Sequence, residues 1–543
     1  MRPAPIADQR AARPEAPAAA SAASEAGEPS YLTHQQIVAV LIGLMAGLLL
    51  AALDQSIVGT ALPRIVSDLG GLNHLSWVVT AYLLTSTAAT PLWGKISDLY
   101  GRRPIFQAAI VIFLVGSVLC GLAQNMPQLI AFRAIQGTGG GGLMAIAFSA
   151  IADIIPPRER GRYQGYFGAV FGTSSVAGPL LGGWFTDGPG WRWIFFINLP
   201  VGAAALVITS IALKIPTVRR EHAIDYPGAA TIVGAVSALL LYLNWAGQEF
   251  GWRALPALAL LLASVGLAVL FVLIELRARE PIIPMGLFKG AVFRVGIAFV
   301  FLTGVAMFGA IIFLPLYLQT VLGMSPTESG LGLLPLVGGL FIASIGSGQL
   351  ITRTGHYKVY PIAGSALMIV ALVLLSSLEV DTPYWQLGAY AFVFGFGLGL
   401  TMQTIVVAVQ NAVPFRDMGA ATSSTTFFRS LGGAIGAAAF GAVFGSRLAH
   451  YLADRFAGAP GVGSPDAVDT DDVQAIQRLT EPVRGLVRGA YTDALSDVFL
   501  VAIPFVALAL VAAIFLRQVP LRTGPTVRRE AEAEPDDHAR SAS

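Results

Sequence analysis

The fold is decided by a stretch that occurs twice, first as Ala152-Asp153-Ile154-Ile155-Pro156-Pro157-Arg158-Glu159-Arg160-Gly161 and again, 258 residues later, as Gln410-Asn411-Ala412-Val413-Pro414-Phe415-Arg416-Asp417-Met418-Gly419. The same offset relates two glycine sets, which are Gly137, Gly139 and Gly141 and then Gly395, Gly397 and Gly399. A looser echo at an offset of 254 relates Gly94 and Gly101 to Gly348 and Gly355. These matches predict two homologous halves.

The composition indicates a membrane protein. Of the 543 residues, 12% are charged and 55% are hydrophobic, whereas soluble domains have roughly 25% charged residues. This balance excludes a cytosolic enzyme and a disordered scaffold, and a net charge of +2 gives no basic field for a nucleic acid. The single cysteine, Cys120, excludes an intrachain disulfide and a cysteine-based metal cluster.

The chain has apolar runs long enough to cross a bilayer, since about 20 helical residues span its hydrocarbon core. We count fourteen, near 37–62, 75–94, 104–123, 128–150, 162–186, 192–213, 228–247, 254–275, 291–320, 328–351, 359–378, 385–410, 419–445 and 494–516. They predict an all-α membrane protein of fourteen transmembrane helices, built from two six-helix bundles plus two inserted helices. The bundles are expected over 36–216 and 285–517, and the insertion over 217–284.

Arginine and lysine gather in alternate short loops, which the positive-inside rule assigns to the cytoplasm. Both termini are therefore expected there, within disordered tails over 1–35 and 518–543. The first span is expected to act as an uncleaved insertion signal. Residues 446–493 are expected to form a long extracytoplasmic loop. A short amphipathic helix within that loop could cap the exit or contact a periplasmic or cell-wall accessory protein. The alternative is that the loop is a passive connector.

Parallel repeats with a binding site between them, near the bilayer midplane, are typical of secondary transporters that alternate access. The run 137–142 matches the GxGxxG pattern of dinucleotide sites, but it lies inside an apolar span with no strand before it. The chain also lacks a GxxxxGK[ST] loop, so we expect no ATP, cofactor or metal.

Three charged residues lie deep within spans, where a charge costs roughly 2.5–3.5 kcal/mol on the insertion scale and is functional by default. Asp54 and Arg133 lie at similar depth, so they can form a pair. A carboxylate poised between burial and a nearby cation could take up a proton outside and release it inside. The alternative is a static ion pair. Arg429, near the bilayer centre, could bind substrate or support packing between the halves.

Two glycine-rich segments are candidate gates. The loop 94–103 joins spans two and three on the inside, and Asp98 there could pair with Arg102 or accept from the amides of a neighbouring helix. Proline and glycines bend the fifth span and allow a close helix approach. The gating candidates are Gly94, Asp98, Gly101, Arg102, Arg103, Gly178, Pro179, Gly182 and Gly183.

A pocket for varied apolar compounds should be lined by polar, aromatic and methionine side chains from spans one, two, four, nine, twelve and thirteen. Besides Arg429, the candidates are Gln55, Tyr82, Gln136, Phe308, Phe313, Tyr317, Met402, Gln403 and Phe428. Each of them could instead face lipid or serve packing.

The chain resembles the fourteen-span drug:proton antiporter branch of the major facilitator superfamily, the quaternary-ammonium and multidrug exporter type. The resemblance rests on the 94–103 loop, on Arg133-Ala134-Ile135-Gln136-Gly137, on Gly178-Pro179-Leu180-Leu181-Gly182-Gly183, and on Leu53-Asp54-Gln55-Ser56-Ile57-Val58-Gly59-Thr60-Ala61-Leu62-Pro63. It implies export of small amphipathic compounds in exchange for protons across a bacterial cytoplasmic membrane, with Arg133 taking part in proton transfer.

Asp54 is the only acid deep in a span, so neutral or monocationic compounds should be carried better than dications. Three alternatives stay open. They are a dedicated exporter of a lipid, siderophore or self-made antibiotic on the same fold; an importer, which the Gly178-Pro179 motif disfavours; and a non-transporting receptor or enzyme.

Overall fold

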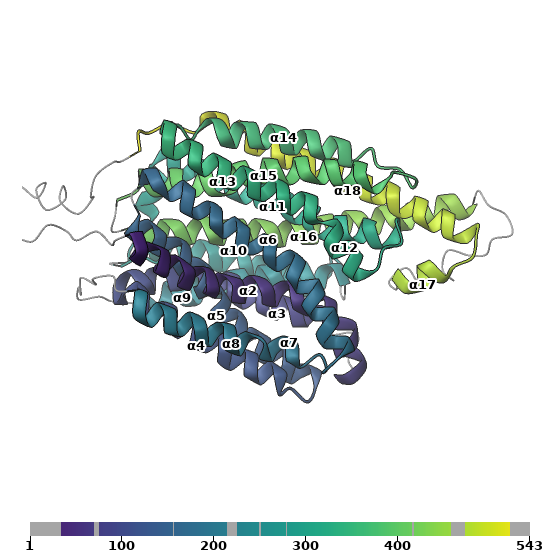
Figure 1. The fold of residues 1–543 in the computed structure, drawn as a ribbon, viewed down its shortest axis with the longest axis horizontal. Helices are drawn as coiled ribbons and strands as arrows, with labels where there is room; N and C mark the ends of the chain where they lie inside the picture. Colours follow the sequence, from purple (N-terminus) through teal and green to yellow (C-terminus); the bar gives the residue numbers. More distant parts are fainter. Residues whose placement is uncertain are drawn as a thin grey trace, which may run out of the picture.

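The computed structural model describes residues 34–69, 75–155, 157–213, 225–248, 251–278, 280–414, 417–457 and 473–521. The two predicted tails lie outside these ranges, apart from 34–35 and 518–521. Every regular element in the described ranges is a helix (Figure 1). This agrees with the all-α class expected from composition.

The first half contains α2 (His34–Leu69), α3 (Leu75–Tyr100), α4 (Arg102–Gly121), α5 (Met126–Ile154), α6 (Pro157–Asp187), the single turn α7 (Trp193–Phe196) and α8 (Asn198–Ala212). The inserted helices are α9 (Tyr226–Gln248) and α10 (Leu255–Glu275). The second half contains the 3-10 turn η2 (Met285–Lys289), α11 (Ala291–Thr320), α12 (Pro326–Gly332), α13 (Leu334–Thr354), α14 (Val359–Leu375), α15 (Tyr384–Ala412), α16 (Met418–Ala457), α17 (Val473–Arg478) and α18 (Val483–Phe515).

In the described part of the chain, 11 helical segments are long and apolar enough to cross a membrane. The three other expected spans correspond to α3, α6 and α14. Helix α14 is apolar but has 17 residues. Helices α3 and α6 have 26 and 31 residues but are less apolar, because they carry polar residues and glycines where the halves meet. A count of fourteen spans therefore stays a prediction.

Glycines at the repeated positions let helices approach until backbone meets backbone. A Cβ on Gly141 of α5 would clash with the Ser86 carbonyl of α3. A Cβ on Gly399 of α15 would clash with the Leu340 carbonyl of α13 in the same way. Thus α5 packs on α3 as α15 packs on α13, which is the relation expected of two homologous halves.

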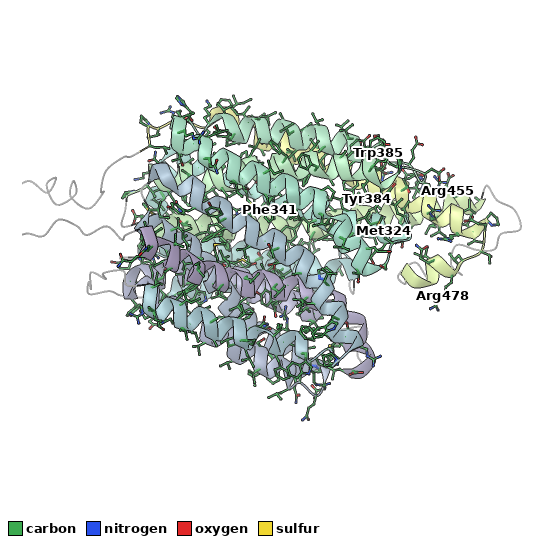
Figure 2. All side chains as sticks on the ribbon, viewed as in Figure 1. Met324, Phe341, Tyr384, Trp385, Arg455 and Arg478 are labelled. Atoms are coloured by element: carbon green, nitrogen blue, oxygen red, sulfur yellow. The ribbon has the colours of Figure 1, made fainter. Side chains whose placement is uncertain are left out.

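The halves meet along two seams, α3 against α16 and α6 against α13 (Figure 1). The repeat offsets place α3 on α13 and α6 on α16, so exchanging the halves converts one seam into the other. In one seam Gly94 lies against Ser423, and in the other Gly172 lies against Phe341 (Figure 2). Helix α9 contacts both α3 and α16, so the inserted pair flanks one seam.

The segment 446–493 differs from the expected loop, since both of its ends are helical. Helix α16 continues to Ala457 over 40 residues, or about 60 Å, roughly twice the thickness of a bilayer core. Arg455 Nη2 pairs with Asp493 Oδ2 at 2.6 Å, which joins the extension of α16 to the start of α18 (Figure 2). Two charged residues of this segment are thus partners between two helices. The expected amphipathic helix is reduced to α17, which has 6 residues.

The first residues of α2 and the last residues of α18 lie at the same end of the bundle (Figure 1). The start of α2 and the end of α18 are therefore expected on one side of a membrane. Which side is cytoplasmic stays a prediction from the positive-inside rule.

Gly399→Ala should destabilise the protein, because its Cβ has to displace the backbone of α13, and such overpacking costs about 1–3 kcal/mol. Gly346→Ala is the matched control. It lies on α13 with nothing within 4 Å of an added Cβ, and alanine is the better helix former. Thermal unfolding in detergent should show a lower midpoint for Gly399→Ala and an unchanged or higher one for Gly346→Ala. Equal midpoints would contradict the backbone-contact interpretation.

Candidate functional site

A buried polar cluster lies within the first half, where four helices converge. It contains Asp54 of α2, Ser117 of α4, Arg133 and Gln136 of α5, and Asn198 of α8. Asp54 and Arg133 are each 1% exposed. Two opposite charges are therefore held away from solvent within an otherwise apolar bundle.

Three donors converge on the Asp54 carboxylate. Arg133 Nη1 donates to Oδ2 at 2.5 Å, and Gln136 Nε2 donates to Oδ1 at 2.7 Å. Asn198 Nδ2 donates to Oδ1 at 3.2 Å. Charge-assisted hydrogen bonds of this kind are about twice as strong as neutral ones, so the cluster holds the carboxyl group of Asp54 in one orientation.

Arg133 is held from several directions as well. Its Nε donates to the Val78 carbonyl at 3.2 Å, and its Nη1 also donates to Gln136 Oε1 at 2.8 Å. Its guanidinium carbon lies 4.3 Å from the centroid of the Tyr82 ring, a geometry that favours a cation–π interaction. The Tyr82 hydroxyl has no hydrogen-bond partner among the described residues. The arginine would therefore keep neighbours if its carboxylate partner were neutralised.

The local sequence of α5 explains this geometry. Asn125 caps the helix, because its side-chain Oδ1 accepts a hydrogen bond from the backbone N–H of Gln128 at 3.0 Å. Arg133 and Gln136 are three residues apart, so they share one helix face. A Cβ on Gly116 would clash with the backbone of Gln136, so glycine there lets α4 come close to α5.

Asn198 and Ser117 of the cluster were not predicted from the sequence. Ser117 Oγ accepts from Asn198 Nδ2 at 2.9 Å and from Gln136 Nε2 at 3.2 Å. An amide and a hydroxyl inside the apolar runs 192–213 and 104–123 were the available signal. Both belong to the set of polar residues that tie α4, α5 and α8 to Asp54.

A second charged group lies at the end of the first half where α3 meets α4. Arg102 pairs with Asp98, and its Nε pairs with Asp153 Oδ2 at 2.6 Å. Its Nη1 donates to Ser97 Oγ at 2.5 Å. Gly101 adopts a φ of 96°, which favours glycine and turns the chain sharply between α3 and α4. Arg103 is half-buried. The predicted pairing of Asp98 with Arg102 is found. The second pairing of Arg102, with Asp153, was not expected.

Asp98 also reaches the other half of the protein. Its carboxylate lies against Gly419, at the N-terminus of α16, where a Cβ would clash with it. A helix N-terminus favours an anion. Lys95 adds a contact in the same region, because its Nζ pairs with Glu280 Oε2 at 2.6 Å in the segment that follows α10. The segment 94–103, expected as a loop, is instead the end of α3, Gly101 and the start of α4. Through Asp98 and Gly94 it contacts α16 across the seam.

The glycine-proline segment of α6 also makes close contacts. A Cβ on Gly178 would clash with Ser56 of α2. Pro179 lies against Gly330 of α12, and Gly183 faces Thr327. Gly182 is buried. The segment thus packs α6 both within its own half and against the second half.

The structure brings some predicted pocket residues together and separates others. Tyr82 and Gln136 belong to the Asp54 cluster. Gln55 is exposed and does not join the cluster. Phe313 packs on Phe444 at a ring distance of 5.6 Å, and the Tyr317 hydroxyl donates to the Glu379 carbonyl at 2.7 Å. These two aromatic side chains therefore fill the core of the second half instead of facing the first.

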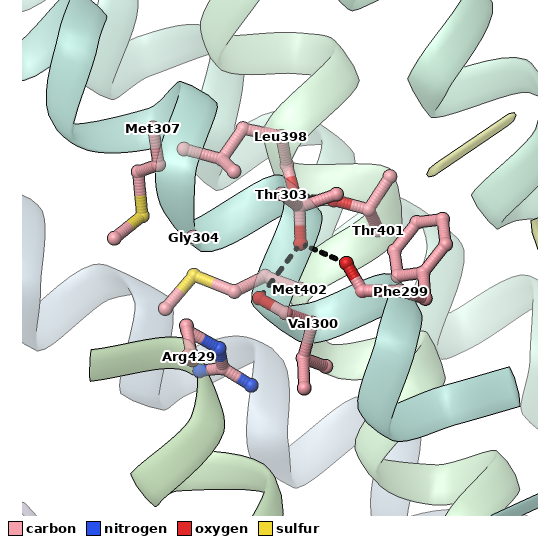
Figure 3. Close-up of a pocket in the computed structure, with 9 residues that line it drawn as sticks. All are labelled: Phe299, Val300, Thr303, Gly304, Met307, Leu398, Thr401, Met402 and Arg429. Atoms are coloured by element: carbon pink, nitrogen blue, oxygen red, sulfur yellow. Dashed lines mark hydrogen bonds between the residues drawn. The ribbon is translucent and has the colours of Figure 1, made fainter. Parts of the chain in front are cut away.

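The remaining candidates lie around α16. Phe308 packs against Gly433, and Phe428 is half-buried beside Phe427. Met402 and Arg429 line a cavity of about 10 Å³ together with residues of α11 (Figure 3). Gln403, which follows Met402 on α15, is buried as well. The second half thus has a small polar interior of its own.

Residues 44–437 match the sequence model of the Major Facilitator Superfamily. The chain belongs to this superfamily. It is 43% identical over 514 residues to an uncharacterised MFS-type transporter of Mycobacterium tuberculosis, covering 94% of this chain and 74% of the relative. It is also 36% identical over 506 residues to the multidrug transporter protein MdtP of Bacillus subtilis, covering 89% of this chain and 93% of the relative.

Membership of the superfamily makes the protein a membrane transporter rather than an enzyme, and the relative MdtP carries the name of a multidrug transporter. The fold agrees. The solved structure of the proton:xylose symporter XylE matches with a TM-score of 0.58 at 14% identity, over 91% of this chain and 98% of the symporter. This likeness concerns the arrangement of the helices alone.

Gly419→Ala should slow transport, because its Cβ pushes the Asp98 carboxylate out of the seam and disfavours the inner closure seen here. Gly441→Ala is the matched control, because it lies on the same helix with nothing within 4 Å of an added Cβ. Dye efflux from cells expressing equal amounts of protein should fall at least about fivefold for Gly419→Ala, the effect of about 1 kcal/mol. An unaltered rate would contradict a gating role for this contact.

Proposed function

We propose that the protein is a proton-coupled antiporter that exports amphipathic neutral or monocationic compounds by alternating access. The observation that carries this proposal is the buried carboxylate of Asp54, held by Arg133, Gln136 and Asn198. Such a group can exist with or without a proton. The charged form compensates the positive charge of Arg133, and the protonated form does not.

Coupling follows from the ion pair. Protonation of Asp54 would remove the anion that compensates Arg133, and breaking one partner of a buried pair costs about 3–5 kcal/mol. That free energy is large enough to change which arrangement of the helices is favoured. Arg133 would still have Tyr82, Val78 and Gln136 as neighbours. Proton binding therefore favours a rearranged state over an unfolded one.

The gating contacts supply two closures. Asp98 at the N-terminus of α16 closes the inner end of one seam, and the Gly178–Gly183 segment of α6 contacts α12 and α2. In the proposed cycle these contacts open in turn while the halves rotate about the central site. The driving force comes from the proton gradient, at about 2.3 kcal/mol per 100 mV and roughly 1.4 kcal/mol per pH unit.

Export is supported by the glycine-proline segment of α6 and by the printed name of MdtP, a multidrug transporter. We infer that the protein resides in the bacterial cytoplasmic membrane with both ends in the cytoplasm, since the inner loops carry the excess arginine. A dedicated exporter of a lipid, siderophore or self-made antibiotic would use the same fold and the same coupling, and only the cargo would differ.

The proposal predicts that everted vesicles expressing the wild type show pH-gradient-driven dye transport and that Asp54→Asn abolishes it. Asparagine keeps the size of the side chain but neither carries the charge nor binds the proton. Glu481→Gln is the control, because it removes an exposed carboxylate far from the cluster. Dye transport by both Asp54→Asn and wild type would place coupling elsewhere.

Vesicles shown to hold a gradient but unable to move dye even with wild-type protein would favour the dedicated exporter.

Substrate charge gives a further expectation. Among the acids that the structure describes, Asp54 and Glu275 are the buried ones, and Glu275 lies at the end of α10, away from the Asp54 cluster. One central carboxylate can balance one positive charge. The dication propidium should therefore be carried more slowly than the monocation ethidium in the same vesicles. Equal rates would count against a single central acid.

A further inference from the structure

The second half contains a buried cation without a partner. Arg429 of α16 is 9% exposed. It makes no ion pair with any residue that the structure describes, and its Nη2 has no hydrogen-bond partner there. Leaving a charged donor buried and unpaired is costly. Arg133 in the first half, by contrast, has the Asp54 carboxylate.

A second unsatisfied group lies on the neighbouring helix. Gln403 of α15 is 2% exposed, and neither its Nε2 nor its Oε1 has a hydrogen-bond partner in the described ranges. Most buried side-chain polar atoms have at least one partner. An amide with both atoms free, like an arginine with a free nitrogen, suggests that a partner comes from outside the chain.

Helix geometry places these two residues at one depth. The Gln410 amide donates to Thr422 Oγ1 at 3.1 Å near the short connection between α15 and α16. Gln403 and Arg429 each lie seven residues further from that connection, which is two helical turns and about 10.5 Å. Gln403 therefore lies on the same face of α15 as Gln410, and Arg429 lies on the same face of α16 as Thr422. The unpaired polar atoms of the two helices lie at the same level.

The surroundings leave Arg429 as the available donor. The cavity beside it is lined by Thr303, Met307 and Met402 (Figure 3). Thr303 Oγ1 already donates to the Phe299 carbonyl at 2.9 Å. The volume of about 10 Å³ is close to that of one water-sized group. Flexible methionine side chains can enlarge such a space.

No acid of the second half that the structure describes pairs with Arg429. These acids are half-buried or exposed, and Asp497, in the middle of α18, pairs with Arg447. The interior of this half therefore carries an uncompensated positive charge. An anionic group of a bound compound would neutralise it.

We propose that Arg429 and Gln403 form a binding subsite for one carboxylate of an amphipathic substrate. The guanidinium and the Gln403 Nε2 would donate to the carboxylate oxygens, and the Gln403 Oε1 would accept from a donor on the same compound. The apolar body of the substrate would extend toward the space between the halves. The assignment rests on the proposed transport function and extends its substrates to compounds carrying one carboxylate.

The test compares 1-pyrenebutyrate with its methyl ester, which differs in lacking the charge. Binding of each to the purified full-length protein in detergent is measured by pyrene fluorescence, without any proton gradient. Arg429→Gln should weaken binding of the acid at least about tenfold, since hydrogen bonds to charged groups contribute about 1.5–3 kcal/mol. Binding of the ester should stay unchanged, which also shows that the variant is folded. Gln403→Leu should weaken binding of the acid by a smaller factor.

Two further variants sharpen the comparison. Arg429→Lys keeps the charge and should restore part of the selectivity for the acid. Arg294→Gln removes an exposed arginine of α11 and should leave both affinities unaltered.

Equal loss of acid and ester binding in Arg429→Gln would assign Arg429 to packing and overturn the proposal. Wild-type protein that does not prefer the acid would also overturn it. A chloride titration distinguishes a site for an inorganic anion. If the wild type does not prefer the acid, and chloride protects the wild type but not Arg429→Gln against thermal unfolding, the site binds an inorganic anion and the proposal is overturned. Since binding needs no gradient, failure of proton-driven export in vesicles leaves this result independent.

Discussion

The ion pair between Asp54 and Arg133 is the constraint around which the first half is arranged. Two charges inside a membrane protein are tolerated when each has a partner and its remaining polar atoms are bonded. That requirement fixes the positions of Gln136, Asn198 and Ser117, which come from three helices. Glycines of α4 and α5 allow the close approach that these bonds need. The helix packing of this half and its chemistry therefore have one common cause.

The two halves share a backbone plan but differ in charge. Glycines at equivalent positions seat α5 on α3 and α15 on α13, so the architecture is symmetric. The interior is not, because the first half holds the compensated pair Asp54–Arg133, whereas Arg429 in the second half has no ion-pair partner among the residues that the structure describes. The duplicated backbone thus carries different charges in its two copies.

The sequence was sufficient for the repeat, the helical class and the meeting of Asp54 with Arg133, since glycine spacing and the depth of charges in apolar runs are visible in one dimension. It was insufficient for Asn198 and Ser117, because their importance depends on which helices touch. Phe313 and Tyr317 were misplaced for a related reason. In a membrane helix the core, the lipid and a pocket all favour apolar side chains, so no periodicity tells them apart. The extension of α16 to Ala457 was missed because its ion pairs join distant parts of the chain.

Helix α16 has a mechanical consequence. One helix of 40 residues without proline contains Gly419 at the inner closure, Arg429 in the interior and Arg455 beyond the opposite end. A rigid helix of this length would act as a lever if it tilted about its middle. A small tilt at the Gly419 end would then become an opposite and larger displacement of the projecting Arg455 end. A movement at one end of the bundle would thereby reach the other end along a single element.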